Sequence, residues 1–393
     1  MALDNAAPYT ASPDTEAAAF RGALDITPGT GGTTIRRLPA WTQAQFGGDN
    51  PLAKANATPS GVRLEFLTDA AWLEVDLTFT RESADWRWRP LQAAVLSLTT
   101  SDGHAESRDF HEGDVLETFP DGSSTLAPGA PSTARFEIPG PRQERSVTLW
   151  FPHRGTVRIH GVRAESPLQP APRTGPRWVH YGSSISQSSH AESPLGVWPV
   201  IAARNLGLDL YNLGLAGSAH LDQFVARTIR DQPAHLITLK VGINIINSAS
   251  LRRRTFAPAL HGFLDTVREG HPGTPLVLIS PIFCPEHEDA PGPSRLVDGE
   301  FLATDLPRKP GDGLMTLRDA RNVLAEAVSE RSASDPNLHY LDGLRLFGSA
   351  DAHLLPDLLH PDAEGYGLIG ERFTDIAAGS QWLAAAAQAP VSS

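Results

Sequence analysis

The sequence predicts two domains of different architecture: an all-β sandwich, and after it an α/β domain whose parallel sheet lies between layers of helices. The chain has 393 residues, which is long for one domain and comfortable for two. Short segments with period-two alternation fill residues 33–165, whereas strand-like and helix-like segments alternate strictly after residue 177. A stretch with four prolines, residues 166–176, separates the two patterns and is interpreted as a linker.

The first domain is expected at residues 31–168, after a loose N-terminal arm at residues 1–30 that is rich in Ala, Pro, Thr and Gly. Alternation of polar and apolar residues buries one face of a strand and exposes the other. Such alternation occurs at residues 61–67, 72–79, 134–138, 146–151 and 156–160. Because no helical pattern separates these segments, they predict a β-sandwich of the jelly-roll type.

The second domain is expected at residues 169–393. Its predicted strands are residues 178–181, 208–213, 236–239, 276–279 and 338–341. Its predicted helices are a segment capped by Ser193 with Pro194 at its first position and ended by Gly207, residues 219–230, 255–269 and 314–331, and a last one after Asp362. Strict alternation of this kind predicts three layers, with a parallel sheet flanked by helices.

Composition argues against several classes of function. The net charge is −12 and no basic run occurs, so we expect no nucleic-acid partner. No window approaches 18 apolar residues, so we expect no membrane partner. No His or Cys spacing fits a zinc site and no phosphate-binding glycine motif occurs, so neither a metal nor a cofactor is expected.

The start and the cysteine content bear on the compartment. Residues 1–20 lack the basic and apolar regions of a signal peptide, which favours a cytoplasmic location, with secretion as the alternative. Cys284 is the single cysteine, so an intramolecular disulfide is excluded. We interpret it as a small apolar filler.

Four short segments follow predicted strands, at the carboxyl ends where ligands bind on parallel sheets. A serine hydroxyl is a weak nucleophile that needs a neighbouring base, and a histidine base needs an acceptor on its far ring nitrogen. Among the 14 histidines only His360 has an aspartate, Asp357, three positions earlier. Backbone N–H groups at a tight glycine turn and a carboxamide can donate to a developing oxyanion. The four segments together therefore indicate acyl-transfer chemistry at a serine.

These segments resemble the four sequence blocks of the SGNH/GDSL hydrolase superfamily. They read Gly182-Ser183-Ser184-Ile185-Ser186, Asn212-Leu213-Gly214-Leu215-Ala216-Gly217, Gly242-Ile243-Asn244 and Asp357-Leu358-Leu359-His360-Pro361. The resemblance covers about residues 177–380 and implies the SGNH fold, a flavodoxin-like arrangement of sheet and helices. It also implies that no cofactor is needed.

The resemblance implies a role for each matching residue. Ser184 would be the nucleophile and would donate its own N–H, His360 would be the base, and Asp357 would orient His360. Gly217 would donate its backbone N–H and Asn244 its side-chain amide to the oxyanion. One position departs from the family pattern: the first block usually carries Asp where this chain has Ser183, but that Asp is not the triad acid.

The start of the first block and the stretch 60–69 are similar to a subgroup with an N-terminal β-sandwich domain, which includes esterases that remove acyl groups from sugars. The expected function is therefore hydrolysis of a carboxylic ester. By analogy with these sugar esterases, we expect a small acyl group of the acetyl type, carried on a carbohydrate. An acyltransferase with the same triad is one alternative. A carbohydrate-binding protein with a vestigial hydrolase domain is the other.

Four further features stay open between a functional and an ordinary interpretation. Gln187, His190 and His220 lie close in sequence to the proposed site residues and are candidates for substrate binding, or else plain loop residues. The long segment 285–313 is interpreted either as a lid or binding loop, or as a disordered insertion.

Overall fold

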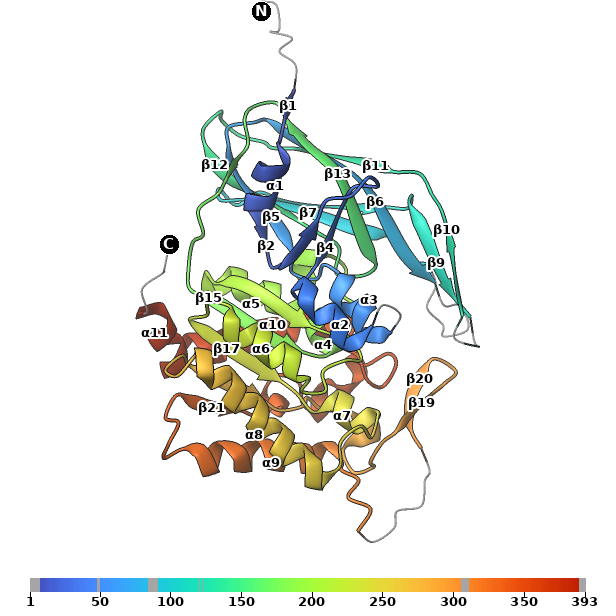
Figure 1. The fold of residues 1–393 in the computed structure, drawn as a ribbon, viewed down its shortest axis with the longest axis vertical. Coiled ribbons are helices and arrows are strands. Elements are labelled where there is room, and N and C mark those ends of the chain that lie inside the picture. Colours follow the sequence, from blue (N-terminus) through green and yellow to red (C-terminus); the bar gives the residue numbers. More distant parts are fainter. Residues whose placement is uncertain are drawn as a thin grey trace, which may run out of the picture. The chain divides into compact units, whose positions relative to one another are not determined.

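The structure is a computed structural model that describes residues 8–47, 50–83, 91–119, 121, 123–304 and 311–388. The chain forms two compact units (Figure 1). Unit 1 comprises Met1–Arg37, Ala57–Arg173 and Ser193–Leu195, and unit 2 comprises Leu38–Asn56, Thr174–Glu192 and Gly196–Ser393. The main change from one unit to the other occurs at residues 173–174, and the domain limit expected from the sequence is 168–169.

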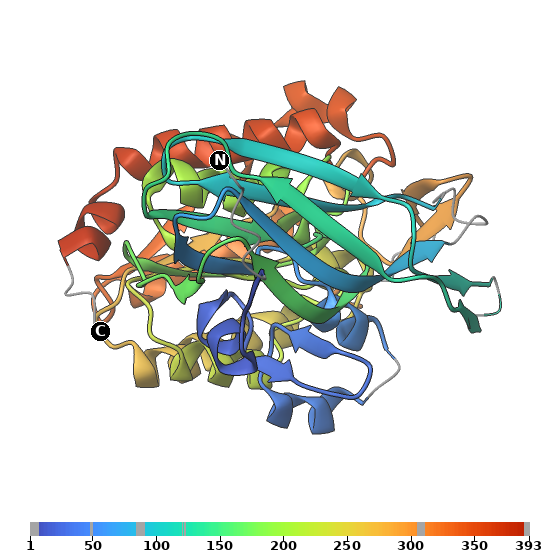
Figure 2. The ribbon, with the colours of Figure 1, turned by 90° about the horizontal axis from the view of Figure 1, so that it is seen from above.

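Unit 1 contains two β-sheets, and Figure 2 shows the ribbon with these strands from above. The eight-stranded sheet has the order β10-β9-β6-β13-β4-β3, with β1 on β13 and β11 on β6. Its strands are β1 (Tyr9–Thr10), β3 (Asp25–Thr27), β4 (Thr33–Arg36), β6 (Trp72–Ser83), β9 (Asp114–Thr118), β10 (Ser124–Ala127), β11 (Ser132–Glu137) and β13 (Thr156–Ala164). The six-stranded sheet has the order β14-β5-β12-β7-β8, with β2 on β5. Its strands are β2 (Phe20–Arg21), β5 (Arg63–Thr68), β7 (Ala94–Thr100), β8 (Ala105–Phe110), β12 (Arg145–Trp150) and β14 (Gln169–Pro170).

Side-chain alternation along the strands builds the core of unit 1. In β6, Leu73, Val75 and Leu77 are buried, and the alternate residues Glu74 and Asp76 form ion pairs with an arginine of β13. Both sheets contribute to one hydrophobic cluster. Its members include Leu64, Phe66, Leu96, Leu98 and Leu149 from one sheet and Leu73, Val75, Leu77, Phe136 and Val157 from the other. The alternation seen in the sequence therefore marks the buried faces.

Two segments of unit 1 are more ordered than their composition indicated. The expected loose arm carries helix α1 (Pro13–Ala19) besides three of the short strands, and Ser12 caps this helix by accepting a hydrogen bond from the Thr15 N–H at 3.2 Å. Residues 1–7 of the arm lie outside the described residues. The expected proline linker contains β14, which pairs with β5. Because β14 ends the order of its sheet, its proline occupies an edge strand, where proline is tolerated.

Unit 2 is built on a five-stranded parallel sheet with the order β16-β15-β17-β18-β21. The strands are β15 (Arg177–Gly182), β16 (Asp209–Gly214), β17 (Leu236–Lys240), β18 (Leu276–Ile279) and β21 (Leu338–Leu341). All five lie within one or two residues of the predicted strands, so the predicted parallel sheet is confirmed. The strand order reverses between β15 and β17, and on sheets of this kind ligands bind at the carboxyl ends of the strands beside such a reversal.

Helices cover both faces of this sheet. They are α5 (Trp198–Leu206), α6 (Gln223–Asp231), α8 (Arg253–Gly270), α9 (Leu317–Arg331), α10 (Ala363–Ala378) and α11 (Gln381–Gln388). In β15, the Trp178 ring stacks on Phe373 of α10 with centroids 5.1 Å apart, and the Tyr181 ring stacks on Phe263 of α8 at 5.5 Å. Residues three apart on a strand point to opposite faces, so α10 and α8 lie on opposite sides of the sheet.

Three predicted helix starts are wrong, and one of them is that of α9, which begins at Leu317 rather than at residue 314. Pro194–Gly196 forms a separate 3-10 turn, and α5 begins only at Trp198 after Val197. Gly207 ends α5 with φ +64°, as predicted. The next helix, α6, begins at Gln223 rather than at residue 219. Within the described part of the chain, no helix combines the length and apolar character that crossing a membrane requires.

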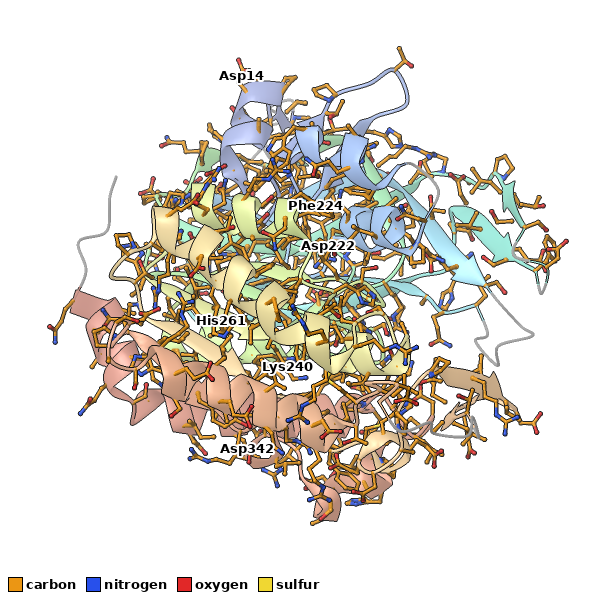
Figure 3. The ribbon with its side chains drawn as sticks, turned by 60° about the horizontal axis from the view of Figure 1, so that its bottom comes forward. Asp14, Asp222, Phe224, Lys240, His261 and Asp342 are labelled. Atoms are coloured by element: carbon orange, nitrogen blue, oxygen red, sulfur yellow. The ribbon has the colours of Figure 1, made fainter. Side chains whose placement is uncertain are left out.

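The segment Leu38–Asn56 joins unit 2 although it precedes most of unit 1 in sequence. It contains a 3-10 turn (Ala40–Thr42), α2 (Gln43–Phe46) and most of α3 (Pro51–Ala57). The ring of Phe46 lies 5.5 Å from that of Phe224 on α6, a residue labelled in Figure 3. The guanidinium of Arg227 stacks over Trp41 at 4.7 Å. These aromatic contacts hold the segment on unit 2.

Candidate active site

Ser184 is the first residue of a short helical turn that follows strand β15. Strand β15 ends at Gly182, and the short helix α4 (Ser184–Gln187) starts two residues later. Ser183 caps α4, because its Oγ accepts a hydrogen bond from the Ile185 N–H at 3.3 Å. Asp and Ser are both good N-caps, so the departure from the usual Asp of this block keeps the local structure. A Cβ at Gly214 of β16 would lie 2.4 Å from the Gln187 nitrogen, so glycine lets β16 pass close to α4.

The structure brings Ser184, His360 and Asp357 into one hydrogen-bonded chain. The Oγ of Ser184 lies 2.8 Å from Nε2 of His360, and Nδ1 of His360 lies 2.7 Å from Oδ2 of Asp357. Oδ1 of Asp357 accepts hydrogen bonds from the backbone N–H groups of Leu359 and His360 at 3.0 and 2.6 Å. Ser184 is 9% exposed and His360 5%. The three side chains that the family resemblance implies as the triad therefore meet at the carboxyl edge of the sheet.

The charge on Asp357 fixes the direction of these hydrogen bonds. Burial acts to raise the pKa of Asp357, but the hydrogen bonds and charge of His360 outweigh burial and lower that pKa to about 2. An ionised carboxylate can only accept hydrogen bonds, so Nδ1 of His360 carries the proton. In the neutral imidazole Nε2 is then the acceptor that faces the Ser184 hydroxyl.

A second buried histidine, His180 in β15, lies shortly before Ser184 in the sequence but has different hydrogen-bond partners from His360. Its Nδ1 bonds to the Thr238 hydroxyl at 2.6 Å and its Nε2 to the Ser186 hydroxyl at 2.7 Å. Burial, followed by the charge of Lys240, lowers the pKa of His180 to about 3. Lys240, labelled in Figure 3, is itself buried, and burial together with the charge of Arg321 lowers its pKa to about 7. His180 therefore stays neutral and has both ring nitrogens engaged.

Asn244 is oriented by a hydrogen bond. It lies in α7 (Ile243–Asn247), directly after β17, and is 3% exposed. Its Oδ1 accepts the Ala219 N–H at 3.0 Å, so its carboxamide has a fixed rotation and its NH₂ points away from that contact. Asn244 is thus presented as a hydrogen-bond donor.

Gly217 lies in the loop that follows β16, next to β15 in the sheet. Its φ is +66°, and a Cβ at this position would meet no atom within 4 Å. The glycine is therefore required by its left-handed backbone conformation rather than by lack of space. His220, three residues later, points its Nε2 at the Gly217 carbonyl at 3.1 Å and its Nδ1 at the Ser250 hydroxyl at 2.8 Å.

The other two candidate substrate-binding residues have different surroundings. Gln187 is buried, and its Oε1 accepts the Ala216 N–H at 3.2 Å, which ties α4 to the loop that carries Gly217. The His190 ring lies edge-on to His360, with centroids 5.4 Å apart. The structure thus brings His190 to the site, whereas Gln187 and His220 support the Gly217 loop. Substrate binding by any of the three stays a prediction.

Phe301 is a residue at this site that the sequence analysis missed. Its ring lies edge-on to His360 with centroids 5.4 Å apart, and its N–H donates to the Asp357 carbonyl at 3.0 Å. It lies in β20 (Glu300–Ala303), inside the segment interpreted as a loop or disordered insertion. No local pattern indicates this contact, because it depends on how a hairpin folds back to a distant turn.

No group of three or more His, Cys, Asp or Glu side chains suited to a metal ion occurs in the described ranges of the chain. The side chains that hydrogen bonds join at the carboxyl edge of the sheet are those of Ser184, His360 and Asp357, which are a hydroxyl, an imidazole and a carboxylate. These are the groups that acyl chemistry at a serine requires.

Comparison with known proteins agrees with this chemistry. Residues 180–368 match the model of the GDSL-like Lipase/Acylhydrolase family. In class, the chain is therefore an acylhydrolase or an acyl-transferring enzyme. The resemblance to SGNH/GDSL hydrolases is thereby confirmed over residues 180–368. No curated protein matches the chain.

Solved structures resemble almost the whole chain. Salicylyl-acyltransferase SsfX3 from a tetracycline biosynthetic pathway is 28% identical, with 96% of this chain and 99% of that chain covered and a TM-score of 0.77. A carbohydrate esterase family 2 enzyme with a carbohydrate-binding domain from Corynascus thermopiles (Myceliophthora fergusii) is 16% identical, with coverages of 86% and 98% and a TM-score of 0.52. The acetyl xylan esterase Est2A from the rumen bacterium Butyrivibrio proteoclasticus is 12% identical, with coverages of 94% and 96% and a TM-score of 0.51. The last two are similar in fold alone.

Proposed function

We propose that this protein hydrolyses a carboxylic ester by nucleophilic attack of Ser184, with His360 as general base and Asp357 as the residue that orients it. The observation that carries the proposal is the chain of hydrogen bonds from Ser184 Oγ to His360 Nε2 at 2.8 Å and from His360 Nδ1 to Asp357 Oδ2 at 2.7 Å. A nucleophile, a base and an orienting acceptor at hydrogen-bond distance are the arrangement that activates a serine.

The reaction proceeds in two acyl-transfer steps. Nε2 of His360 takes the proton of the Ser184 hydroxyl as Oγ attacks the acyl carbon, and the imidazolium that forms is stabilised by the ionised Asp357. His360 then gives this proton to the leaving alcohol, which leaves the acyl group on Ser184. Water, deprotonated by His360, attacks the acyl carbon, and His360 returns the proton to Ser184 as the acid departs.

The proposed oxyanion donors are the N–H groups of Ser184 and Gly217 and the side-chain amide of Asn244. Two observations support this assignment: the Ala219 N–H fixes the carboxamide of Asn244, and Gln187 and His220 hold the loop of Gly217. Donors held in place before the reaction stabilise charge without reorganisation in the transition state.

Asn244→Ala is expected to lower kcat by about 10²–10³ while KM changes little, because the amide meets charge that exists mainly in the transition state. The measurement is initial-rate kinetics with p-nitrophenyl acetate. Asn247→Ala is the matched control, since Asn247 lies on the same short helix but is only partly buried, and it should keep the wild-type kcat. An effect of Asn244→Ala confined to KM would instead assign Asn244 to ground-state binding.

For the substrate, we propose a small acyl ester, with a carbohydrate as the alcohol. The support is the likeness in fold to the family 2 carbohydrate esterase and to the acetyl xylan esterase. A panel of acyl esters that varies the acyl chain length on a fixed sugar, and the sugar on a fixed acetyl group, tests the substrate proposal.

We also propose that unit 1 is a jelly-roll-like β-sandwich, because its two sheets share one hydrophobic core.

Acyl transfer to an alcohol is the second candidate, favoured by the 28% identity to salicylyl-acyltransferase SsfX3 over 96% of this chain. Both reactions share the acyl-serine and differ in what attacks it. With p-nitrophenyl acetate and an added alcohol, hydrolysis predicts one acetate for each p-nitrophenol released at every alcohol concentration. A new ester that accounts for most of the released acyl group would favour the transferase. A wild-type protein that turns over no ester would favour the carbohydrate-binding alternative.

A further inference from the structure

The segment between β18 and α9 is folded over most of its length. It contains a 3-10 turn (Pro285–His287) and an antiparallel hairpin of β19 (Ser294–Val297) and β20 (Glu300–Ala303). The sequence of residues 285–313 allows either a lid or binding loop or a disordered insertion, and residues 305–310 lie outside the described residues. Its described part makes specific contacts with the rest of unit 2.

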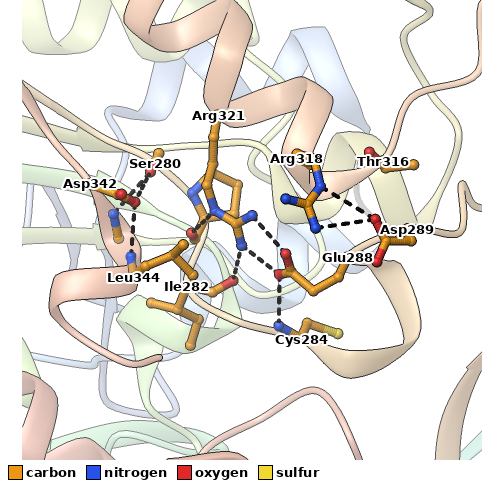
Figure 4. A network of polar contacts seen from close by, with 12 residues as sticks. Ser280, Ile282, Cys284, Glu288, Asp289, Thr316, Arg318, Arg321, Asp342 and Leu344 are labelled. Atoms are coloured by element: carbon orange, nitrogen blue, oxygen red, sulfur yellow. Dashed lines mark hydrogen bonds and ion pairs between the residues drawn. The ribbon is translucent and has the colours of Figure 1, made fainter. Parts of the chain in front are cut away.

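A buried ion pair anchors the first part of this segment to α9 (Figure 4). Arg321 donates from Nη1 and Nη2 to the two carboxylate oxygens of Glu288 at 2.8 and 2.5 Å. The same guanidinium donates to the carbonyls of Pro281 at 3.1 Å and Ile282 at 3.2 Å. Glu288 also accepts the backbone N–H of Cys284 at 3.4 Å. One guanidinium thus fixes both ends of a short loop, and a bidentate pair of this kind has a well-defined geometry.

Two donors of the anchored segment reach the turn that holds Asp357 and His360. The Cys284 thiol donates to the Leu358 carbonyl at 3.3 Å, and the Phe301 N–H donates to the Asp357 carbonyl at 3.0 Å. Burial raises the pKa of Cys284 to about 12, so the sulfur keeps its proton and can act as a donor. Consecutive carbonyls of the turn are therefore held from outside it.

The turn itself contains an unfavourable backbone conformation. Leu358, between Asp357 and His360, has φ +63°, in the left-handed region that residues other than glycine and asparagine rarely adopt. Such a conformation persists only where the surrounding structure holds it. The two donors from the segment act on the carbonyls that flank the Leu358 N–H and Cα, which is where a relaxing turn would have to move.

We propose that residues 281–303 form a clamp that holds the Asp357–His360 turn in its active geometry, with Arg321 and Glu288 as positioning residues. This inference rests on the proposed function. Without the clamp, Leu358 would relax and carry the His360 ring away from Ser184. Displacement of a catalytic group by about 1 Å can cost roughly 10²-fold in rate, whereas the contacts that bind ground-state substrate would be little affected.

Substitutions at Cys284 test the contact with the turn. Cys284→Ala removes the donor to the Leu358 carbonyl and is expected to lower kcat for p-nitrophenyl acetate by roughly 10- to 100-fold with little change in KM. Cys284→Ser keeps a hydroxyl donor at nearly the same place and should retain most of the wild-type kcat. The effect of Cys284→Ala should shrink in a Leu358→Gly background, because glycine adopts positive φ without the steric cost.

Arg321→Lys tests the anchor. A lysine keeps the positive charge beside Glu288, but it cannot reproduce the planar fork that meets two carboxylate oxygens and two carbonyls. We expect a loss of kcat at unchanged KM, measured where circular dichroism shows the variant to be folded. Arg318→Lys is the matched control, because Arg318 lies one turn away on α9 and also pairs with a residue of the clamp, Asp289, but both of these side chains are exposed (Figure 4). An exposed ion pair contributes little, so this contact should not hold the clamp in place. It should behave as wild type.

The outcomes separate the clamp from the proposed function. Wild-type kcat in both Cys284→Ala and Arg321→Lys would overturn the clamp. So would a loss in Cys284→Ala that the serine variant and the glycine background leave equally large, since the loss would then reflect general destabilisation. If the wild type neither hydrolyses p-nitrophenyl acetate nor reacts with an organophosphonate at Ser184, the proposed function fails and the clamp with it.

Discussion

Ser184→Ala is expected to abolish ester hydrolysis and leave the fold intact. The change removes one hydroxyl, whose partner is Nε2 of His360, and Ser183 remains to cap α4. Removal of a serine nucleophile from such a triad costs on the order of 10⁶ in kcat, because base and acid then have no nucleophile to activate. The measurement is turnover of p-nitrophenyl acetate, together with mass spectrometry after treatment with an organophosphonate. The wild type should gain one adduct on Ser184, and the variant none.

Ser186→Ala is the matched control, because Ser186 lies on the same turn but its hydroxyl bonds to His180 rather than to His360. Loss of the hydroxyl leaves the buried Nε2 of His180 without this partner. The free energy of unfolding of the variant should therefore be lower than that of the wild type by about 1–3 kcal/mol. It should still react with the phosphonate and hydrolyse ester. Turnover retained in a clean Ser184→Ala preparation would rule out Ser184 as the nucleophile.

The parts of unit 2 that could be predicted are those specified locally. Each strand of the parallel sheet is a short apolar run bounded by turn residues, so its position is visible in a window of a few residues. The Asp357–His360 pair could be predicted because a spacing of three puts both side chains on one turn. Asn244 and Gly217 needed the family pattern as well, since an asparagine or a glycine after a strand has many uses.

The contacts that sequence reasoning missed are those made between distant segments. Nothing near Phe301 or Cys284 indicates that they reach the Asp357–Leu358 carbonyls, because that depends on the path of the hairpin. The start of α5 was misplaced for a related reason. Ser193-Pro194 carries a good helix-start signal, but the chain uses it for a 3-10 turn, and Pro199 lies at the actual start of the helix.

Asp357→Asn is expected to lower kcat on the order of 10⁴-fold without unfolding the turn. The Asn side-chain oxygen can still accept the N–H groups of Leu359 and His360, as Oδ1 of Asp357 does at 3.0 and 2.6 Å. Its NH₂ would then face Nδ1 of His360 and make that nitrogen an acceptor. The proton moves to Nε2, which can no longer take a proton from Ser184.

Asp362→Asn is the control for Asp357→Asn. Asp362 caps α10 by accepting the Gly365 N–H at 2.9 Å, and Asn caps a helix as well as Asp does, so kcat should stay at the wild-type value.

The charge of Asp357 also makes the stability of the fold depend on pH. Its pKa is lowered to about 2, so the stabilisation it gives the fold is present above the pKa of the unfolded chain, about 3.9, and is lost as pH falls through about 2. Asp357→Asn should therefore lose stability relative to wild type at pH 7, with the difference vanishing in acid. An Asp357→Asn variant with wild-type kcat would show that His360 keeps its tautomer without Asp357. The orienting role would then belong to another group.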